Sequence, residues 1–281
     1  MTPPLVVKFG GELLEEPSRM ATVVAAVRDI ALQAPLGPVV PVVIVHGGGK
    51  EIDAALNTAG IEKRQVDGLR VTDAATLDIV VAVLAGAVNT RVVAALTAAG
   101  VPAVGLTGAD GACGLSETAP PHRTVDGRTV DLGRVGLPAE KADMRLLETL
   151  LRDQFVPVVA SIGADRDGRL LNVNADTMAG HLAARLRARR LVIAGSTAGV
   201  LDDHGATVAL LDPAAIARLV SGGTATAGMI AKLRACEHAL ASGVDDVVIV
   251  DGRDREALRA AASGAVPGSA TRIVTTVGTR S

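Results

Sequence analysis

Short runs rich in Val and Ile alternate along this chain with longer Ala- and Leu-rich segments of helical period, and this alternation restricts the possible folds more than any other feature. Continuous apolar runs of this kind are typical of strands buried on both faces. They are LVVKF (5–9), VVPVVIV (39–45), PAVGL (102–106), VPVVASI (156–162), LVIAG (191–195), VVIV (247–250) and RIVTTV (272–277). The intervening segments predict helices near residues 17–33, 49–59, 73–99, 140–153, 174–188, 212–220, 227–242 and 253–263. Because alternating strands and helices are joined by right-handed crossovers, we predict an α/β fold, an open αβα sandwich with a mainly parallel central sheet, built either as a single unit or as two close lobes.

One segment interrupts the alternation. From Cys113 to Gly136 the chain has little apolar content, a pair of prolines, and an Asp126-Gly127 step between short β-like runs, which is typical of a hairpin. A second Asp-Gly step at Asp167-Gly168 precedes LLNVNAD. No Pro/Ser-rich boundary, internal repeat or low-complexity tract is present. We interpret residues 113–136 as an excursion beside a functional site, not as a linker.

The composition argues against several classes of protein. With 281 residues, 49% of them apolar and 21% charged, the chain can bury a large core. Its formal net charge is -2, and two Phe with no Tyr or Trp leave nothing to stack on exposed bases, so we expect no nucleic-acid partner. No apolar run reaches membrane-spanning length without a charge or a Gly/Pro break, and the opening residues MTPPLVV lack the features of a signal peptide. We therefore expect a cytoplasmic protein without membrane contact.

The metal-binding residue types are scattered. Cys113 and Cys236 are isolated and far apart in sequence, which favours reduced thiols over a disulfide framework or a metal site. The five His show no spacing typical of metal ligands. The sequence predicts no metal site built from side chains.

Two groups of glycines stand where a predicted strand becomes a helix. Gly10 and Gly11 follow LVVKF, and Gly47, Gly48 and Gly49 follow VVIVH. In an open parallel sheet, ligands bind beyond the carboxyl ends of the strands, where bare backbone and helix N-termini accommodate a phosphate or a carboxylate. For one such loop alone, a tight turn without a ligand is the better interpretation.

Two lysines favour the ligand-binding interpretation. Lys8 lies inside an apolar strand, where an ammonium group is costly unless it meets a partner, although an edge-strand Lys reaching solvent gives the same pattern. Lys232, after SGGTATAGMIA, is by itself typical of a solvated helix residue. The chain has no G-x-x-x-x-G-K-[ST] loop, and GLTGADG (105–111) lacks the G-x-G-x-x-G spacing, which argues against a P-loop ATPase and a dinucleotide-dependent dehydrogenase.

A series of motifs occurs in order from the first strand to the last: KFGG (8–11), VHGGG (45–49), DGLRVTD (67–73), LAGAVN (84–89), VGLTGADG (104–111), SIG (161–163), NVNAD (172–176), GMIAKL (228–233) and DGR (251–253). Taken together, these motifs resemble the amino acid kinase family, and within it the acetylglutamate kinases. The resemblance implies transfer of the γ-phosphoryl group of ATP to the side-chain carboxylate of N-acetyl-L-glutamate, the second step of arginine biosynthesis. A carboxylate needs no general base, so catalysis reduces to positioning and charge neutralisation.

The resemblance assigns roles to single residues. It implies that Lys8 and Lys232 stabilise the transition state and that Asp176 holds both ammonium groups in place. Without the lysines, a charge that complements the dipole at a helix N-terminus would be the better explanation of Asp176. Gly10 and Gly11 are expected to offer N–H groups to the γ-phosphate.

The acyl amino acid is expected on the other side of the phosphoryl group. The resemblance places Gly48 and Gly49 at its reacting end, Arg70 at its α-carboxylate and Asn172 at its main-chain-like groups. In isolation, Arg70 is typical of a surface charge and Asn172 of a turn residue.

The resemblance also divides the chain into an N-terminal lobe (1–163) for acyl amino acid binding and dimerisation and a C-terminal lobe (164–281) for ATP. The nucleotide is expected to contact Ser196, Thr197, Ala198, Gly199, Val200 and Leu201, and also Thr224, Ala225 and Thr226. Ser196 departs from the family pattern, in which an aspartate is common. Adenine is expected in an aliphatic slot, and Mg²⁺ is expected to arrive with ATP, held largely by phosphates and water, with no tightly bound cofactor.

Arginine-inhibited relatives carry an extra helix before the first strand, whereas here seven residues precede Lys8. We therefore expect a homodimer formed through the first half, with the apolar helix 73–99 as a candidate interface or a core helix, and no strong feedback by arginine.

Two other functions fit the residues. A kinase for a carrier-linked aminoadipate or glutamate requires a basic docking surface, for which the candidate is RLRARR (185–190), also typical of a solvated helix end. A catalytically silent sensor of nucleotide or amino acid is the other alternative, and the combination of Lys8, Asp176 and Lys232 argues against it.

Overall fold

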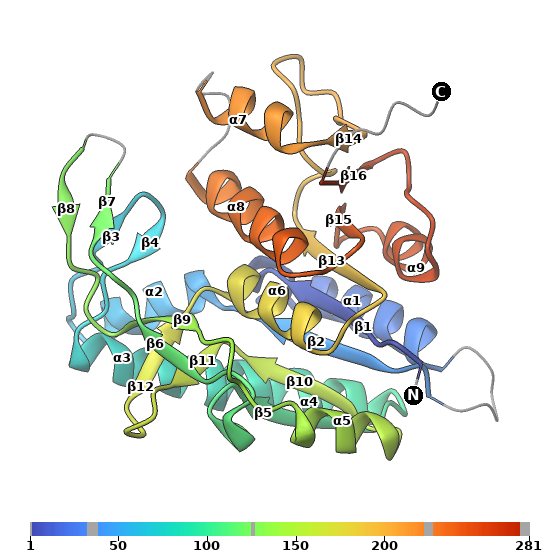
Figure 1. Ribbon diagram of the computed structural model, residues 1–281. Coiled ribbons are helices and arrows are strands. Elements are labelled where there is room, and N and C mark those ends of the chain that lie inside the picture. The colour runs from blue at the N-terminus through green and yellow to red at the C-terminus, as the bar shows by residue number, and fades with distance from the viewer. Residues whose placement is uncertain (1, 33–38, 125–126, 222–226, 276–281) are drawn as a thin grey trace.

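The computed structural model describes residues 2–32, 39–124, 127–221 and 227–275, and it confirms the predicted α/β sandwich (Figure 1). The central sheet has the order β14-β16-β15-β13-β1-β2-β10-β5. Its strands are β1 (Leu5–Phe9), β2 (Val42–His46), β5 (Ala103–Thr107), β10 (Val156–Ala160), β13 (Arg190–Gly195), β14 (Leu210–Leu211), β15 (Val247–Asp251) and β16 (Ala270–Ile273). The ladder is parallel from β15 to β5, while β16 runs antiparallel to β15. Each strand matches an apolar run except the two-residue β14, which sequence reasoning missed.

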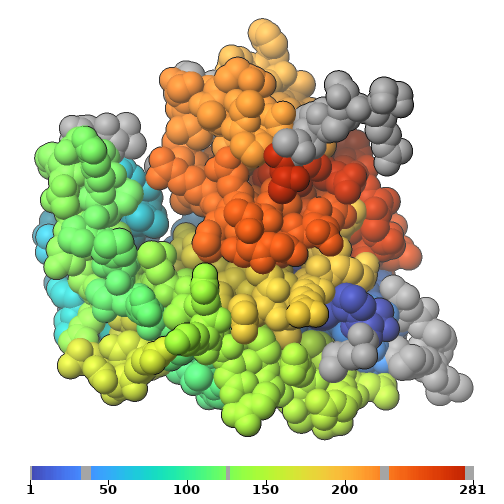
Figure 2. Space-filling model, viewed as in Figure 1, coloured from blue at the N-terminus to red at the C-terminus, as the bar shows by residue number. Residues whose placement is uncertain are grey.

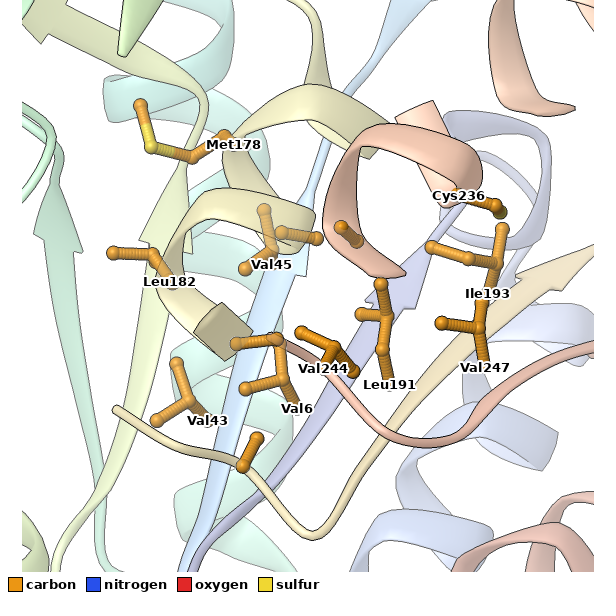
Figure 3. Packing of buried hydrophobic residues seen from close by; sticks show 14 of the residues in the cluster. Val6, Val43, Val45, Met178, Leu182, Leu191, Ile193, Cys236, Val244 and Val247 are labelled. Carbon is orange, nitrogen blue, oxygen red and sulfur yellow. The ribbon is translucent and has the colours of Figure 1, made fainter. Parts of the chain in front are cut away.

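Helices cover both faces of this sheet (Figure 1). They are α1 (Pro17–Ala31), α2 (Gly49–Thr58), α3 (Ala74–Val81), α4 (Asn89–Ala98), α5 (Arg145–Arg152), α6 (Ala175–Arg185), α7 (Pro213–Ser221), α8 (Ala227–Ala241) and α9 (Arg255–Ser263). Because side chains alternate along a strand, Val6 packs with residues of α6 and α8 on one face, whereas Leu5 and Val7 pack with α1, α4 and α9 on the other. Figure 3 shows the first of these cores, with Val6, Val43 and Leu191 facing Leu182 and Cys236. By the same alternation Lys8 points to the α6 and α8 side.

The interruption in the alternation contributes β6 and the start of β9 to a second, smaller sheet. Its order is β11 (Ile162–Ala164), β12 (Leu170–Val173), β9 (Val135–Pro138) and β6 (Ser116–Thr118). Two hairpins extend from this region, β3 (Gln65–Val66) with β4 (Leu69–Arg70) and β7 (His122–Arg123) with β8 (Thr129–Val130). The β7–β8 pairing agrees with the predicted hairpin, although Asp126 lies outside the described residues. On the face drawn in Figure 2, the molecule is hollowed between the β7–β8 hairpin (green) and helices α7 and α8 (orange).

The predicted long helix 73–99 is continuous but not uniform. Between α3 and α4 it contains a π-helical segment, η2 (Ala82–Val88). By length and composition it could cross a membrane, and 33% of its most apolar stretch is buried. Val80, Leu84 and Val88 belong to buried clusters, so one side of this helix is a packed part of the sandwich.

The two predicted lobes share one sheet. Strand β13, from the predicted C-terminal lobe, pairs directly with β1 of the predicted N-terminal lobe over residues 5–9. The division of function at residue 163 stays a prediction.

Candidate active site

Three charged residues from different elements meet where β1 ends. The ammonium group of Lys8, on β1, lies 2.9 Å from Oδ1 of Asp176, the second residue of α6. The ammonium group of Lys232, on α8, lies 3.3 Å from the same oxygen and 3.4 Å from Oδ2. The side chains of Lys8 and Asp176 are each 9% exposed, and that of Lys232 is 15% exposed. One buried carboxylate thus holds two buried ammonium groups, and the structure brings together the three residues that were predicted to act together.

Local structure explains the position of Asp176. Asn174 is the N-cap of α6, and its side-chain oxygen accepts hydrogen bonds from the N–H groups of Asp176 (2.9 Å) and Thr177 (3.1 Å). This cap fixes the first turn of α6, from which the carboxylate reaches both lysines. Asp176 therefore lies at a helix N-terminus and also organises the charges.

Burial and mutual attraction set the protonation of this triad. Burial acts to raise the pKa of Asp176, but the charges of Lys8 and Lys232 outweigh it and lower that pKa to about 2. Burial, together with the second ammonium group, lowers the pKa of Lys8. Burial acts in the same direction on Lys232, but attraction to Asp176 outweighs it and raises that pKa.

The two glycine loops lie against each other beside the triad. A Cβ added at Gly11 would lie 2.6 Å from Cα of Gly48 and 3.1 Å from the nitrogen of Gly49, so a side chain there is excluded by backbone. The same addition at Gly48 would lie 2.8 Å from the side chain of Leu84. Bare backbone from two strand ends therefore forms one surface.

Gly10 does not act as predicted. Its N–H donates a hydrogen bond to the carbonyl oxygen of Ala194 (3.0 Å), which joins it to β13, so it is not available to a phosphate. A Cβ added at Gly10 would overlap both carboxylate oxygens of Glu12. The bare backbone of Gly10 is thus the surface against which the Glu12 carboxylate lies.

Sequence reasoning did not assign a role to His46 and Asn89, although both stand in motifs that carry the resemblance. The side-chain amide of Asn89 donates to Nε2 of His46 (3.0 Å) and to the carbonyl of Val158 (2.9 Å). Nδ1 of His46 then carries the proton and donates to the carbonyl of Gly47 (3.1 Å). Burial lowers the pKa of His46 to about 4, so the ring is neutral at pH 7. This pair anchors the start of the Gly47–Gly49 loop.

Arg70 lies beside the glycine loop that ends at Gly49. Its Nη2 contacts Oδ1 of Asp53 (2.5 Å) and the carbonyl of Gly49 (3.3 Å). Its side chain is 8% exposed, and its Nη1 is buried without a hydrogen-bond partner among the described residues. A buried guanidinium with a free donor is suited to a carboxylate ligand. The side-chain amide of Asn172 donates a hydrogen bond to Oγ1 of Thr72 (3.1 Å). Thr72 lies two residues after Arg70 in the sequence.

A cavity of about 370 Å³ opens beside these residues, lined by Glu12, Glu15, Gly49, Lys50, Asp53, Gln65 and Ser196. It joins residues after β1, α2, the β3–β4 hairpin and the loop after β13. Gly49, predicted to bind the acyl amino acid, and Ser196, predicted to bind the nucleotide, thus line the same space.

The predicted nucleotide loop divides into exposed and buried parts. Thr197 and Leu201 are exposed, whereas Val200 is buried in the core. The N–H of Val200 donates to Oγ1 of Thr271 (2.7 Å), and Gly199 has a φ of 68° in contact with that residue. This loop is therefore anchored to β16. Thr224, Ala225 and Thr226 lie outside the described residues.

Comparison with known proteins shows which family this chain is similar to. The profile of the amino acid kinase family matches residues 3–251. Two curated relatives, each called acetylglutamate kinase, come from Erythrobacter litoralis and Rhizorhabdus wittichii. They are 42% and 43% identical to this chain, over 88% of it and 82% of each relative.

Solved structures agree with this match. An N-acetylglutamate synthase from Neisseria gonorrhoeae, complexed with coenzyme A and N-acetyl-glutamate, superposes with a TM-score of 0.79 at 26% identity, over 98% of this chain and 60% of that protein. The protein smu.665 from Streptococcus mutans has a TM-score of 0.77 at 25% identity, over 98% and 100%. A carbamate kinase from Giardia lamblia bound to AMP-PNP, with a TM-score of 0.67 at 15% identity over 98% and 99%, shares the fold.

The triad predicts a pH-dependent stability. Asp176→Asn leaves two buried ammonium groups without a counter-charge, so we expect the free energy of unfolding to fall by about 3–5 kcal/mol at pH 7. The pKa of Asp176 is lowered on folding from 3.8 to about 2. The stabilisation by its charge is therefore complete above about pH 5 and is lost as the pH falls through about 2.

Urea unfolding at pH 7, pH 5 and pH 3 measures this effect. The gap between wild type and Asp176→Asn should be the same at pH 7 and pH 5 and smaller at pH 3. Asp143→Asn is the matched control, because Asp143 pairs with Arg145, whose side chain is 87% exposed; it should match wild type at pH 7. A gap that widens on acidification would contradict the proposed charge state.

Proposed function

The chain belongs to the amino acid kinase family, and we propose that it acts as an acetylglutamate kinase. It transfers the γ-phosphoryl group of ATP to the side-chain carboxylate of N-acetyl-L-glutamate and produces N-acetyl-L-glutamyl 5-phosphate and ADP. The observation that carries this proposal is the buried triad of Lys8, Asp176 and Lys232 beside two touching glycine loops. The names of the relatives, at 42% and 43% identity, support the substrate.

The reaction moves no proton. A carboxylate oxygen forms a bond to the γ-phosphorus, the bond from that phosphorus to the β,γ-bridging oxygen breaks, and ADP leaves with the electron pair. Because an anion must approach a polyanion, the protein has to neutralise charge and align the reacting atoms. Lys8, on strand β1, and Lys232, on helix α8, each supply one positive charge. Asp176 fixes their positions and keeps each ammonium group aimed at one point.

The acyl amino acid is bound on the α2 side of the triad. The N–H groups of Gly11, Gly48 and Gly49 surround the transferred phosphoryl group and the attacking carboxylate. Arg70 binds the α-carboxylate of the substrate with its guanidinium group, which contacts the cavity-lining residues Asp53 and Gly49. Asn172 exchanges its hydrogen bond with Thr72 for one to the acetylamino group.

ATP is bound on the β13 side. The loop from Ser196 to Leu201 follows β13 and contacts the nucleotide through its backbone and the Ser196 hydroxyl, with adenine in an aliphatic slot. Mg²⁺ arrives with ATP and supplies charge neutralisation at the β- and γ-phosphates, held largely by phosphate and water oxygens. The reduced thiols of Cys113 and Cys236, both buried, fit a cytoplasmic enzyme.

Two of the basic residues in the candidate docking segment for a carrier protein are engaged inside the fold. Arg190 is 3% exposed, and its Nε donates to Oδ2 of Asp246 (2.6 Å). Arg189 donates to the carbonyl of Ala262 (2.8 Å). These contacts leave that segment a poor docking surface, so a free acyl amino acid is the favoured substrate. A silent sensor has no need of two buried lysines on one carboxylate.

The enzyme forms a homodimer through the side of helix 74–98 that faces away from the sheet. Ala82, Gly86, Ala87 and Thr90 are exposed on this helix. Two thirds of its most apolar stretch is unburied in a single chain, and small residues allow an identical helix to cross closely.

A product assay tests the function. Purified protein with MgATP should form an acyl phosphate that hydroxylamine traps as a hydroxamate. We expect turnover of N-acetyl-L-glutamate to exceed that of N-acetyl-L-2-aminoadipate and of unacetylated glutamate by at least on the order of 10-fold in kcat/KM, because one methylene or one missing acetyl contact costs about that much. Turnover of none of the three would overturn the proposal.

The two halves of the site should respond differently to substitution. Lys8→Ala or Lys232→Ala should lower kcat by on the order of 10²-fold with a smaller change in KM, because each ammonium acts on charge that develops in the transition state. Arg70→Ala should mainly raise the KM for N-acetyl-L-glutamate. The control is Lys63→Ala, which removes the other cation bound to Asp53 but has a side chain 46% exposed.

Steady-state kinetics on the four variants gives both constants. Lys63→Ala should stay close to wild type. A lysine variant changed only in KM, or an Arg70→Ala enzyme with unchanged KM, would remove that residue from its assigned role.

The dimer interface is tested by a substitution at Gly86, where a single chain has room for a side chain. A Cβ at Gly86 meets no atom within 4 Å in a single chain, so Gly86→Glu should fold normally but place a charge in the interface. We expect light scattering to report a dimer for wild type and for Thr58→Glu, an exposed control on α2, and a monomer for Gly86→Glu. A monomeric wild type, or a dimeric Gly86→Glu, would rule this interface out.

A further inference from the structure

Glu12 places a negative charge beside the phosphate-binding glycines, where the reaction needs positive charge. It lies in the short helix η1 (Gly11–Leu13) directly after β1. Both oxygens of its carboxylate lie against Gly10, and Oε1 lies 3.8 Å from the position of a Cβ at Gly195. The carboxylate therefore sits over the adjoining ends of β1 and β13, between the predicted substrate side and the nucleotide side.

This carboxylate has no partner of its own in the described part of the chain. No hydrogen bond or ion pair of its oxygens is formed there, although it lies near enough to Lys8 and Lys232 to help raise the pKa of each ammonium group. Both lysines are held by Asp176 instead. An unpaired carboxylate lining a cavity with the Ser196 hydroxyl is a free oxygen ligand.

The charges around the phosphoryl position cancel. The positive charges of Lys8 and Lys232 are matched by the negative charges of Asp176 and Glu12. A site that is neutral before ligands enter offers no net attraction to a polyphosphate, and the nearest unpaired group repels it. The missing positive charge must then come with the nucleotide. Mg²⁺ prefers oxygen ligands and keeps several waters, which suits a single carboxylate at the edge of a cavity.

We propose that Glu12 makes nucleotide binding selective for the magnesium complex of ATP, because its carboxylate contacts the Mg²⁺ that ATP carries, directly or through one water. This inference rests on the proposed function of the site as an ATP-dependent kinase. It assigns a role to a residue outside the triad. Glu12 repels free ATP and attracts MgATP, so the same charge acts in opposite directions on the two ligands.

The test is the binding of a non-hydrolysable ATP analogue, AMP-PNP, measured calorimetrically with excess Mg²⁺ and with EDTA. For the wild type we expect a Kd that is much lower with Mg²⁺. Glu12→Gln keeps the size of the side chain and removes its charge, so it should weaken binding of the Mg²⁺ form and strengthen binding of the metal-free form. The ratio of the two Kd values should fall on the order of 10-fold.

Two further variants complete the design. Glu16→Gln makes the same chemical change at an exposed carboxylate paired with Arg19, and its ratio should equal that of the wild type. Glu12→Ala should show the same direction as Glu12→Gln, so the inference stays testable where either variant is poorly folded.

Three results would overturn the inference. An unchanged ratio in Glu12→Gln would show that its carboxylate does not contact the metal. Tighter binding of both forms by the same factor would show simple repulsion of anions. A wild type that binds neither form would overturn the inference together with the proposed function, whereas a wild type active in the hydroxamate assay with an unchanged Glu12→Gln ratio leaves the function intact.

Discussion

The contact of one buried carboxylate with two buried ammonium groups is the interaction on which this structure depends. An ammonium group as enclosed as that of Lys8 is strongly destabilising unless an opposite charge lies within contact distance, and Asp176 meets that need at 2.9 Å. The requirement ties β1 to α6, and through Lys232 it ties α6 to α8. The interaction that stabilises the buried charge of Lys8 also leaves two positive charges at the end of the sheet where we propose that phosphoryl transfer takes place.

Bare backbone is the second constraint, and it follows from the first. The charges of Lys8 and Lys232 act on a phosphoryl group only if that group can approach the ends of β1 and β2. The close contact between Gly11 and Gly48 shows that there is no space for side chains at these strand ends. The loop at Gly48 is held from below by the neutral His46 and by Asn89, which follows the π-helical segment directly. The residue that directly follows a local irregularity of a long helix thus supports the loop that is proposed to bind the reacting carboxylate.

Sequence reasoning predicted the triad and the glycine loops but assigned Gly10 the wrong role. The N–H of Gly10 continues the β1–β13 ladder, and the motif KFGG alone does not distinguish a ladder N–H from a free one. Glu12 passed unnoticed because a glutamate after a glycine pair is typical of an exposed helix start. Its significance comes from Gly195 and Ser196, which lie more than 180 residues away in sequence and a few ångströms away in space. The ion pair between Arg70 and Asp53 was also missed, because no motif links Arg70 to a residue of α2.

The sequence by itself determined the class of fold, the approximate positions of most helices and strands, and the residue types available for phosphoryl transfer. Apolar periodicity and glycine position are local properties, and a chain expresses them without knowledge of distant segments. Only the tertiary structure decided which charges pair, which N–H groups remain free, and which carboxylate faces the cavity. Those outcomes depend on strand order and on the packing of α6 and α8 over β1, because an ion pair or a close backbone approach exists only between atoms that the fold brings within a few ångströms.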